Sequence, residues 1–195
     1  MSRRRKQKGI VGILVAIAAI VVAVGQQQGW FESAQKGVMT TQPGQYAVAR
    51  YVDGDTIVVD MNGQQETVRM IGVDTPETHK PNTPVQCYGP AASAYTKNRI
   101  HAQGDKVRLV SDSLSTNRDR YNRLLRYVTL PDGTNHNQDL VAKGYAFAYL
   151  SFPFTKSDDF AKAQADAQAQ KLGLWGNCTP TLESNGRWQS NTEGS

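Results

Sequence analysis

Five charged residues carry the side chains that hydrolysis of a phosphodiester requires: Asp55, Arg69, Asp74, Glu77 and Arg123. Hard cations such as Ca²⁺ prefer several oxygen ligands, which carboxylates and backbone carbonyls supply. Planar guanidinium groups bind two phosphate oxygens at once, and a further carboxylate can take a proton from an attacking water. Taken together, these residue types indicate metal-assisted cleavage of phosphodiester bonds.

Each segment that contains these residues also has a purely structural interpretation. Val-Asp-Gly-Asp-Thr at 52–56 is typical of a turn, in which Asp side chains cap backbone groups and Gly supplies a positive φ. Arg69 alternates with apolar neighbours, as a solvent-facing strand residue does. Residues 73–77 fit the end of a strand, and residues 119–125 fit a solvated loop. Only the occurrence of all four segments in this order favours a catalytic site.

The pattern around these segments predicts the elements that position them. Runs rich in Val, Ile, Tyr and Thr predict three strands at 46–52, 56–61 and 66–73, and Asn-Gly at 62–63 is a strong hairpin signal. The further elements expected are a helix at 90–102, strands at 106–111 and 124–130, a short helix at 137–143, and a last helix at 156–172 with Phe160, Ala163 and Ala167 on one side. This order suits a small α+β domain built on a five-stranded barrel, although periodicity alone does not separate it from other α+β arrangements.

The net charge does not by itself indicate binding to nucleic acid. The chain has 22 Lys and Arg residues against 17 Asp and Glu, a formal net charge of +5. Five of the basic residues lie within residues 3–8, which leaves 17 basic against 17 acidic residues in the remainder. The high isoelectric point therefore reflects the N-terminus, and any case for a nucleic-acid partner must come from local chemistry.

The N-terminus has the pattern of an export signal or a signal anchor. A basic cluster precedes an apolar run from Ile10 to Val24, and three Gln residues follow Gly25. The run is shorter than the roughly 20 residues that comfortably span a bilayer, and Ala23-Val24-Gly25 offers small residues for cleavage. Residues 1–25 are thus either a cleaved signal peptide or an anchor that holds the protein in the membrane through residues 9–25. Both alternatives predict an extracytoplasmic domain, membrane-anchored or secreted.

The rest of the chain divides into three parts by composition. Residues 26–43, rich in Gln, Gly, Ser and Thr, are expected to be a linker. Residues 44–178 form the expected domain. Residues 179–195 are polar and are expected to be a disordered tail.

Cysteine and histidine do not suggest a metal site. Cys87 and Cys178, an even count in an exported protein, suggest one disulfide, with two unrelated buried thiols as the alternative. His79, His101 and His136 share no ligand spacing, and we expect them on the surface or in loops.

From about Tyr46 to Trp175 the chain resembles staphylococcal nuclease and its thermonuclease-like relatives. Asp-Thr-Pro-Glu with an Arg five residues before its Asp is distinctive of them. The matching pieces are Val-Asp-Gly-Asp-Thr at 52–56, Val-Arg-Met-Ile-Gly-Val-Asp-Thr-Pro-Glu at 68–77, Tyr-Gly-Pro-Ala-Ala-Ser-Ala at 88–94, Arg-Asp-Arg-Tyr-Asn-Arg at 118–123 and Gly-Leu-Trp at 173–175.

This resemblance implies a fold and an activity. The fold would be a five-stranded OB-fold β-barrel with three helices, here preceded by an N-terminal hydrophobic helix. The activity would be calcium-dependent hydrolysis of DNA and RNA that leaves 3′-phosphates. Single-stranded or denatured substrates would be preferred, and the enzyme would be a monomer.

The resemblance also implies a metal site and a base. Asp55 and Asp74 would ligate Ca²⁺, with the backbone carbonyl of Thr75 as a further ligand. Glu77 would be the general base that activates water.

The same resemblance assigns the groups that hold the substrate. Arg69 and Arg123 would bind the phosphate and stabilise the transition state, while Tyr121 and Tyr149 would line the nucleotide pocket. The family pattern before the second arginine is Tyr-Gly-Arg, and Asn122 stands here in place of Gly. Asn adopts a left-handed φ more readily than most residues, so the turn is expected to survive.

A second hypothesis is a non-catalytic OB-fold module that binds nucleic acid or protein at the cell surface. Fold alone does not decide between a module and an enzyme. Modules of this family have lost the acidic and arginine positions. All five are present here, which favours the enzyme.

Overall fold

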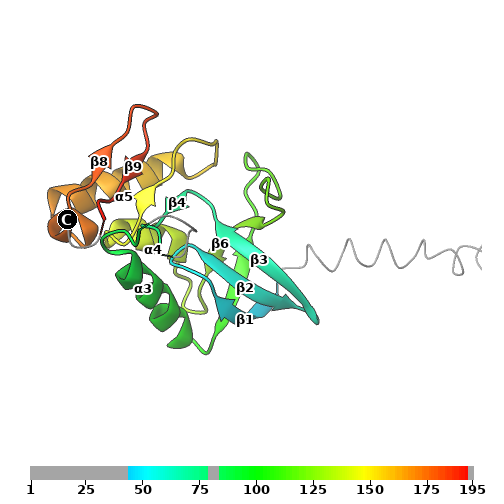
Figure 1. Ribbon diagram of the computed structural model, residues 1–195. Coiled ribbons are helices and arrows are strands. Elements are labelled where there is room, and N and C mark those ends of the chain that lie inside the picture. Colours follow the sequence, from blue (N-terminus) through cyan, green and yellow to red (C-terminus); the bar gives the residue numbers. More distant parts are fainter. Residues whose placement is uncertain (1–43, 79–83, 193–195) are drawn as a thin grey trace, which may run out of the picture. The chain divides into compact units, whose positions relative to one another are not determined.

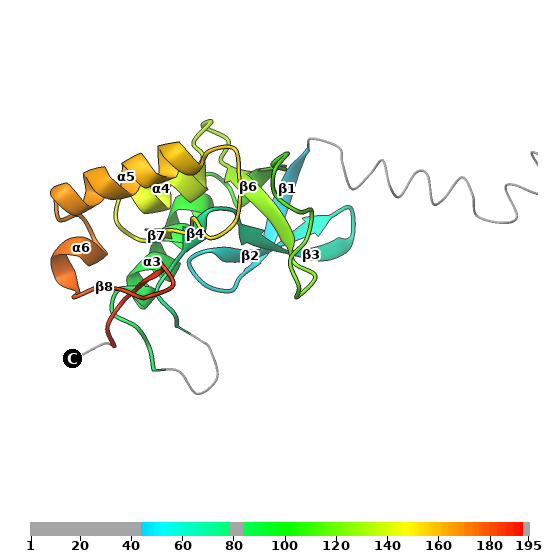
Figure 2. The same cartoon turned by 90° about the horizontal axis from the view of Figure 1, so that it is seen from above.

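The computed structural model describes residues 44–78 and 84–192. Five strands close into a barrel (Figures 1 and 2). Neighbouring strands are antiparallel except for β3 and β6, which are parallel. In barrel order the strands are β1 (Gln45–Tyr51), β2 (Thr56–Met61), β3 (Gln64–Met70), β6 (Leu124–Thr129) and β5 (Lys106–Val110). The predicted α+β barrel is confirmed.

Three main helices accompany the barrel, as predicted, and they gather on one side of it (Figures 1 and 2). The last of them is α5 (Ser157–Ala169). Its predicted apolar face, with Phe160, Ala163 and Ala167, is buried. The remaining elements are α3 (Gly89–His101), α4 (His136–Ala142), the short α6 (Leu174–Asn177), and the two-residue strands β4 (Val73–Asp74), β7 (Phe147–Ala148), β8 (Thr181–Leu182) and β9 (Trp188–Gln189).

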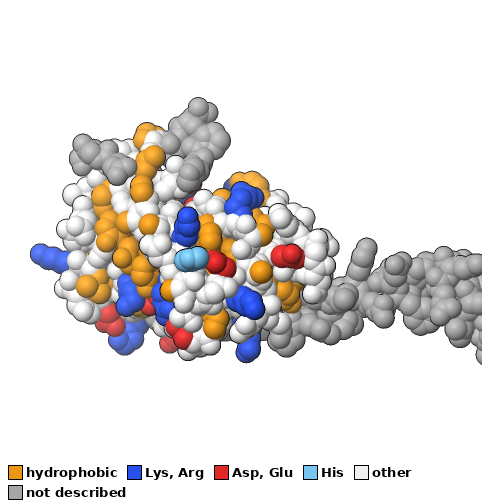
Figure 3. Space-filling view, turned by 90° about the horizontal axis from the view of Figure 1, so that it is seen from below, with side chains coloured by type: hydrophobic (Ala, Val, Ile, Leu, Met, Phe, Trp, Pro, Cys, Tyr) orange, Lys and Arg blue, Asp and Glu red, His pale blue; other side chains and the backbone are white. Residues whose placement is uncertain are grey.

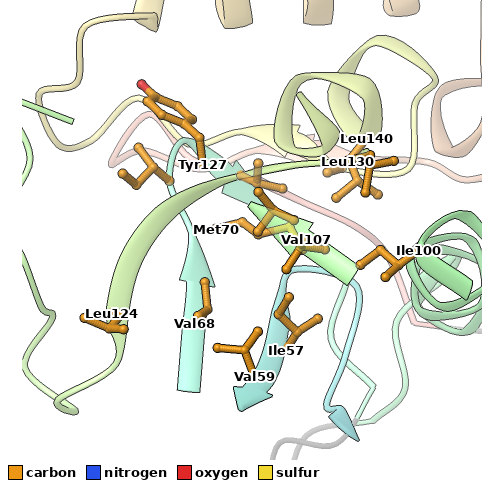
Figure 4. Close-up of a cluster of buried hydrophobic side chains, with 14 of the residues drawn as sticks. Ile57, Val59, Val68, Met70, Ile100, Val107, Leu124, Tyr127, Leu130 and Leu140 are labelled. Carbon is orange, nitrogen blue, oxygen red and sulfur yellow. The ribbon is translucent and has the colours of Figure 1, made fainter. Parts of the chain in front are cut away.

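The barrel interior is filled by apolar side chains that face inward from the strands (Figure 4). Ile57 pairs with Val68 across the β2–β3 ladder, and both are fully buried. Asn62 and Gly63 connect these strands with φ angles of 58° and 86°, which confirms the predicted hairpin turn. Ile100 of α3 adds a buried side chain from the helical layer. The barrel thus provides a rigid support for the loops at the strand ends.

The third predicted strand, residues 66–73, is wrong as a single element. β3 ends at Met70, and the chain turns at Gly72, whose φ is +74°. A Cβ at this glycine would lie 2.7 Å from the ring of Phe154 and 3.1 Å from that of Phe160. The turn therefore exists because two aromatic side chains of a distant segment pack against bare backbone. It places Asp74 on β4, which pairs with β7 instead of continuing the barrel.

The prediction of a disordered tail from residue 179 is also wrong for residues 179–192. Strands β8 and β9 form a hairpin that belongs to the same compact unit as the barrel. A turn with Gly186 at φ +79° connects them. Trp188 packs edge-on against Trp175, with 5.0 Å between ring centroids, and stacks near Phe147. Trp188 thus contributes a large apolar contact to a segment whose composition is otherwise polar.

A disulfide joins Cys87 and Cys178, as predicted, with 5.9 Å between their Cα atoms and a sequence separation of 91. It connects the start of α3 to the root of the hairpin. The backbone N–H of Cys87 also donates to the carbonyl of Asn191, and the Ser190 hydroxyl donates to the carbonyl of Cys87. The hairpin is therefore attached to the domain at both of its ends.

The predicted N-terminal hydrophobic helix and the linker at 26–43 lie outside the described residues. Among the residues that the structure does describe, no helix is long and apolar enough to cross a membrane.

Candidate active site

The two carboxylates among the predicted metal ligands, Asp55 and Asp74, contact the same nitrogen of one guanidinium group. Nη2 of Arg69 is 3.0 Å from Oδ2 of Asp55 and 3.4 Å from Oδ1 of Asp74. Nη1 of the same side chain donates to the carbonyls of Val73 at 2.7 Å and of Met70 at 3.1 Å. Arg69 therefore does not face solvent. It brings together the first acidic loop and the turn that follows β3.

The loop that carries Asp55 is held against the turn that carries Thr75. The backbone N–H of Thr75 donates to Oδ2 of Asp55 at 3.0 Å, and the hydroxyl of Thr56 donates to Oδ1 at 2.9 Å. A Cβ at Gly54 would lie 2.7 Å from Cγ2 of Thr75 and 3.0 Å from Cβ of Ala92. The glycine in the Asp-Gly-Asp motif is thus required by a close approach to both neighbours.

His136 supports this loop from behind, and its predicted surface position is wrong. Its side chain is fully buried. The hydroxyl of Thr96 donates to the carbonyl of Gly54 at 2.6 Å. Because its proton is used in that bond, the hydroxyl oxygen of Thr96 accepts from Nε2 of His136, 3.0 Å away. Nδ1 is buried and has no hydrogen-bond partner within the described part of the chain. The ring is therefore neutral, with its proton on Nε2, and burial lowers the pKa of His136 to about 4.

This depressed pKa predicts a specific loss of stability in acid. The unfolded chain takes up a proton on this histidine below pH about 6.5, whereas the folded chain does so only near pH 4. The stabilisation is complete above pH 6.5 and is lost as the pH falls toward 4, by about 3 kcal/mol in total. Gln at position 136 keeps a donor and does not titrate, so the unfolding free energy of His136→Gln will depend less on pH across this window.

Urea denaturation at several pH values between 4 and 7.5 measures that slope. The parent protein, measured at the same pH values, is the reference for this slope. An unchanged slope in His136→Gln would show that this histidine is not held neutral.

The acidic residues of the site repel one another. Burial and the negative charge of Asp55 raise the pKa of Asp53 to about 7. Burial also raises the pKa of Asp74, and Asp55 adds to that rise, while Arg69 and Arg187 oppose it. The site therefore places acidic groups in a partly dry environment where carrying a negative charge is costly, and a bound cation would lower that cost.

Arg123 lies in a tight turn before β6, held by a residue that sequence reasoning missed. Asp119 accepts hydrogen bonds from the backbone N–H groups of Tyr121 and Arg123, and its other oxygen lies 2.7 Å from both Nε and Nη2 of Arg123. Burial alone would raise the pKa of Asp119, but these hydrogen bonds lower it below its ordinary value. Asn122 has φ 64°, so the predicted left-handed turn is confirmed. The sequence signal for Asp119 was its position: an Asp often accepts hydrogen bonds from backbone N–H groups a few residues later, and here these belong to the residues two and four positions on.

Both predicted arginines and both predicted tyrosines line one cleft of about 720 Å³, together with Asp74. Tyr121 is 64% exposed and lies 5.3 Å from the guanidinium carbon of Arg123.

Glu77 lies in a separate, smaller cavity of about 240 Å³, beside Asp74 and Thr75. Its carboxylate accepts the backbone N–H of Thr78, and its own N–H donates to the side chain of Gln86. Asp74 thus lines both cavities: Glu77 lies in the smaller one, and the two predicted arginines and two predicted tyrosines line the larger one.

A second residue missed by sequence reasoning separates these two cavities. Arg187, from the turn of the β8–β9 hairpin, lines both of them. Nη2 of Arg187 is 2.8 Å from Oδ2 of Asp74, and its guanidinium lies 4.8 Å from the centre of the Tyr149 ring. The only sequence signal was its isolation, since it is the one basic residue after Cys178.

The donor set suits a hard divalent cation. Oxygens of Asp55 and Asp74 face the same nitrogen of Arg69, and the backbone of Thr75 is adjacent to them. No cluster of three or more His, Cys, Asp or Glu side chains within residues 44–78 and 84–192 could hold a metal by itself. A cation here would therefore rely on two carboxylates, a backbone carbonyl and water, a combination that Ca²⁺ accepts because its coordination is flexible.

Charge is mixed on the face drawn in Figure 3, where blue basic side chains are interspersed with red acidic ones among the described residues. The mixture on this face agrees with the balance of charge expected from the sequence beyond its N-terminus.

Comparison with known proteins agrees with this arrangement. A family model described as "Staphylococcal nuclease homologue" matches residues 67–177. The thermonuclease of Staphylococcus hyicus is 43% identical over 175 residues, which cover 88% of this chain and 99% of that protein. The thermonuclease of Staphylococcus intermedius is 42% identical over 170 residues, 87% of this chain and 98% of that protein. The SPbeta prophage-derived endonuclease YokF of Bacillus subtilis (strain 168) is 44% identical over 128 residues, 65% of this chain and 42% of that protein. The chain therefore belongs to the staphylococcal nuclease family and is a nuclease, a hydrolase that acts on phosphodiester bonds.

Proposed function

We propose that the protein is a calcium-dependent nuclease that hydrolyses both DNA and RNA outside the cytoplasm and leaves 3′-phosphate products. The observation that carries the proposal is the convergence of Asp55 and Asp74 on Arg69, at 3.0 and 3.4 Å, at the edge of a cleft that also contains Arg123. Two carboxylates suit a hard cation, and two guanidinium groups suit a phosphate.

The residues divide the work of cleavage among them. Asp55, Asp74 and the carbonyl of Thr75 would hold Ca²⁺, which supplies charge to the phosphate oxygens when it is bound. Arg69 and Arg123 bind the scissile phosphate and stabilise the charge that grows on it in the transition state. Glu77 takes the proton from the attacking water.

The shape of the cleft supports a preference for single-stranded or denatured substrates. Tyr121 and Phe152, which are 64% and 66% exposed, line it together with Tyr149. Exposed aromatic rings stack on unpaired bases of any sequence, whereas paired bases inside a duplex do not offer their faces. The same tolerance accommodates both DNA and RNA.

The disulfide and the N-terminal sequence support an extracytoplasmic location. Disulfides persist in oxidising compartments and are rare in the cytosol, and Cys87 is bonded to Cys178. The basic and apolar pattern of residues 1–25 supports export, with the mature protein either secreted or held by its anchor.

Digestion of denatured DNA by the purified protein tests the proposal. Activity should appear with Ca²⁺, disappear with a chelator and return on adding Ca²⁺ in excess. Asp55→Ala removes a hard oxygen ligand, so the calcium concentration for half-maximal activity should rise at least about tenfold. Lys162→Ala, which alters an exposed pair with Asp166 on α5, is the control and should keep the parental requirement. Full activity in the chelator would contradict the calcium requirement.

A further inference from the structure

Arg187 lies on the β8–β9 hairpin, which is fixed to the domain by contacts of neighbouring residues. Trp188, the next residue, packs against Trp175, and Ser190 is bonded to the backbone of Cys87. The side chain of Arg187 is 44% exposed, so part of its guanidinium faces the solvent of the cleft while one nitrogen contacts Asp74. The hairpin therefore delivers a third guanidinium to a site that already contains Arg69 and Arg123.

This guanidinium occupies an oxygen that a cation would need. Arg69 contacts Oδ1 of Asp74, and Arg187 contacts Oδ2 at 2.8 Å. A carboxylate oxygen that ligates a divalent cation holds a guanidinium less well, because the two positive charges then repel each other. Cation binding at Asp74 must therefore weaken its contact with Arg187.

The position of Arg187 also separates the groups that have to act together. Arg187 and Asp74 are shared by the cavity that contains Glu77 and by the cleft that contains the other arginines. A phosphate held by Arg69 must be reached by a water that Glu77 activates. Of the two side chains that line both cavities, Arg187 is the more exposed, at 44% against 24% for Asp74.

We propose that Arg187 is a substrate-binding residue that Asp74 holds until a cation takes over the carboxylate. Once released, its guanidinium binds the phosphate next to the scissile one, while the ring of Tyr149, 4.8 Å away, keeps it at the wall of the cleft. The inference rests on the proposed function, since it requires a cation at Asp74. It predicts that one substitution will change the affinities for cation and for substrate in opposite directions.

The first measurement is calorimetric titration of Ca²⁺ into the protein without nucleic acid. Arg187→Ala removes the competitor, so Ca²⁺ should bind about two- to fivefold more tightly than to the parent, the range expected for a partly exposed ion pair. Lys162→Ala removes one positive charge from α5 without contact to Asp74 and should leave the affinity unchanged.

The second measurement is KM on single-stranded DNA at saturating Ca²⁺ and several salt concentrations. Arg187→Ala should raise KM about tenfold at low salt and change kcat less than twofold. The slope of log KM against log salt should fall by about 0.7, the loss of one phosphate contact on a single strand. Arg187→Lys keeps the charge and should keep most of that slope.

The outcomes separate this inference from the function on which it rests. Tighter calcium binding together with a higher KM and a shallower slope supports it. Weaker binding of both calcium and substrate would mean that Arg187 only stabilises the hairpin, and an unchanged calcium affinity or an unchanged slope would also overturn the inference. If the parent itself binds no calcium, the proposed function fails first, and the inference fails with it.

Discussion

Replacement of Arg69 by Lys will lower kcat on denatured DNA by about 10²- to 10³-fold at saturating Ca²⁺. The guanidinium contacts two carboxylates and two backbone carbonyls, at 2.7 to 3.4 Å. A lysine ammonium keeps the charge, but its three donors around a point cannot match four acceptors that a planar guanidinium reaches with two nitrogens. One well-placed donor is worth about 3–4 kcal/mol in a transition state that gains charge, which sets the size of the loss.

The matched control for this substitution is Arg99→Lys. Arg99 lies on α3, forms an ion pair with Asp132 at 2.7 Å, and does not line the cleft. Its Lys variant should keep parental turnover. Circular dichroism and calcium titration of both variants will show whether the fold and metal binding persist. Near-parental turnover of a folded Arg69→Lys variant would mean that the phosphate is held elsewhere.

Removal of the disulfide will cost about 4–5 kcal/mol of unfolding free energy. The bond closes a loop with a sequence separation of 91, and in the chain-entropy model a cross-link of this span removes that much conformational freedom from the unfolded state. The variant is Cys87→Ser combined with Cys178→Ser, compared with the parent by urea denaturation. The expected change is a lower midpoint with an m-value that rises, because the unfolded chain is less restricted.

The parent measured in reductant is the control for the two serines. It should lose the same stability as the double variant, because both lack only the cross-link. The variant should remain folded and active at low temperature, since neither cysteine is among the proposed catalytic, metal-binding or substrate-binding residues. A difference of less than 1 kcal/mol between variant and parent would show that the hairpin and α3 are held together by other contacts.

Local patterns in the sequence predicted most of the strands and helices, and the resemblance to the nuclease family implied the barrel and the roles of the site residues. Runs rich in Val, Ile, Tyr and Thr predicted the strands, and Asn62-Gly63 predicted a turn between two of them, because these features depend on the backbone preferences of adjacent residues. The buried face of α5 followed from helical spacing for the same reason. The resemblance to the nuclease family implied that Asp55 and Asp74 are metal ligands and that Arg69 binds phosphate, and the structure adds that both carboxylates contact this arginine.

Only the tertiary structure decided the features that depend on distant partners. The end of β3 before Gly72 depends on the rings of Phe154 and Phe160, more than 80 residues away, and the residues around the glycine do not indicate these contacts. The burial of His136 depends on Thr96, forty residues earlier, and on the loop of Gly54. These contacts are set by packing and not by propensity, so no local pattern in the sequence records them.

The order of the C-terminal hairpin also depends on distant partners. Its polar composition indicates disorder by the usual criteria, yet Trp188 against Trp175 and the disulfide at Cys178 hold it in place. Arg187 then reaches Asp74 across a sequence separation of 113. The sequence determined which residues could carry out the chemistry. The folded chain decided which further side chain lies on the proposed metal ligand, because that proximity arises only when both ends of the domain pack together.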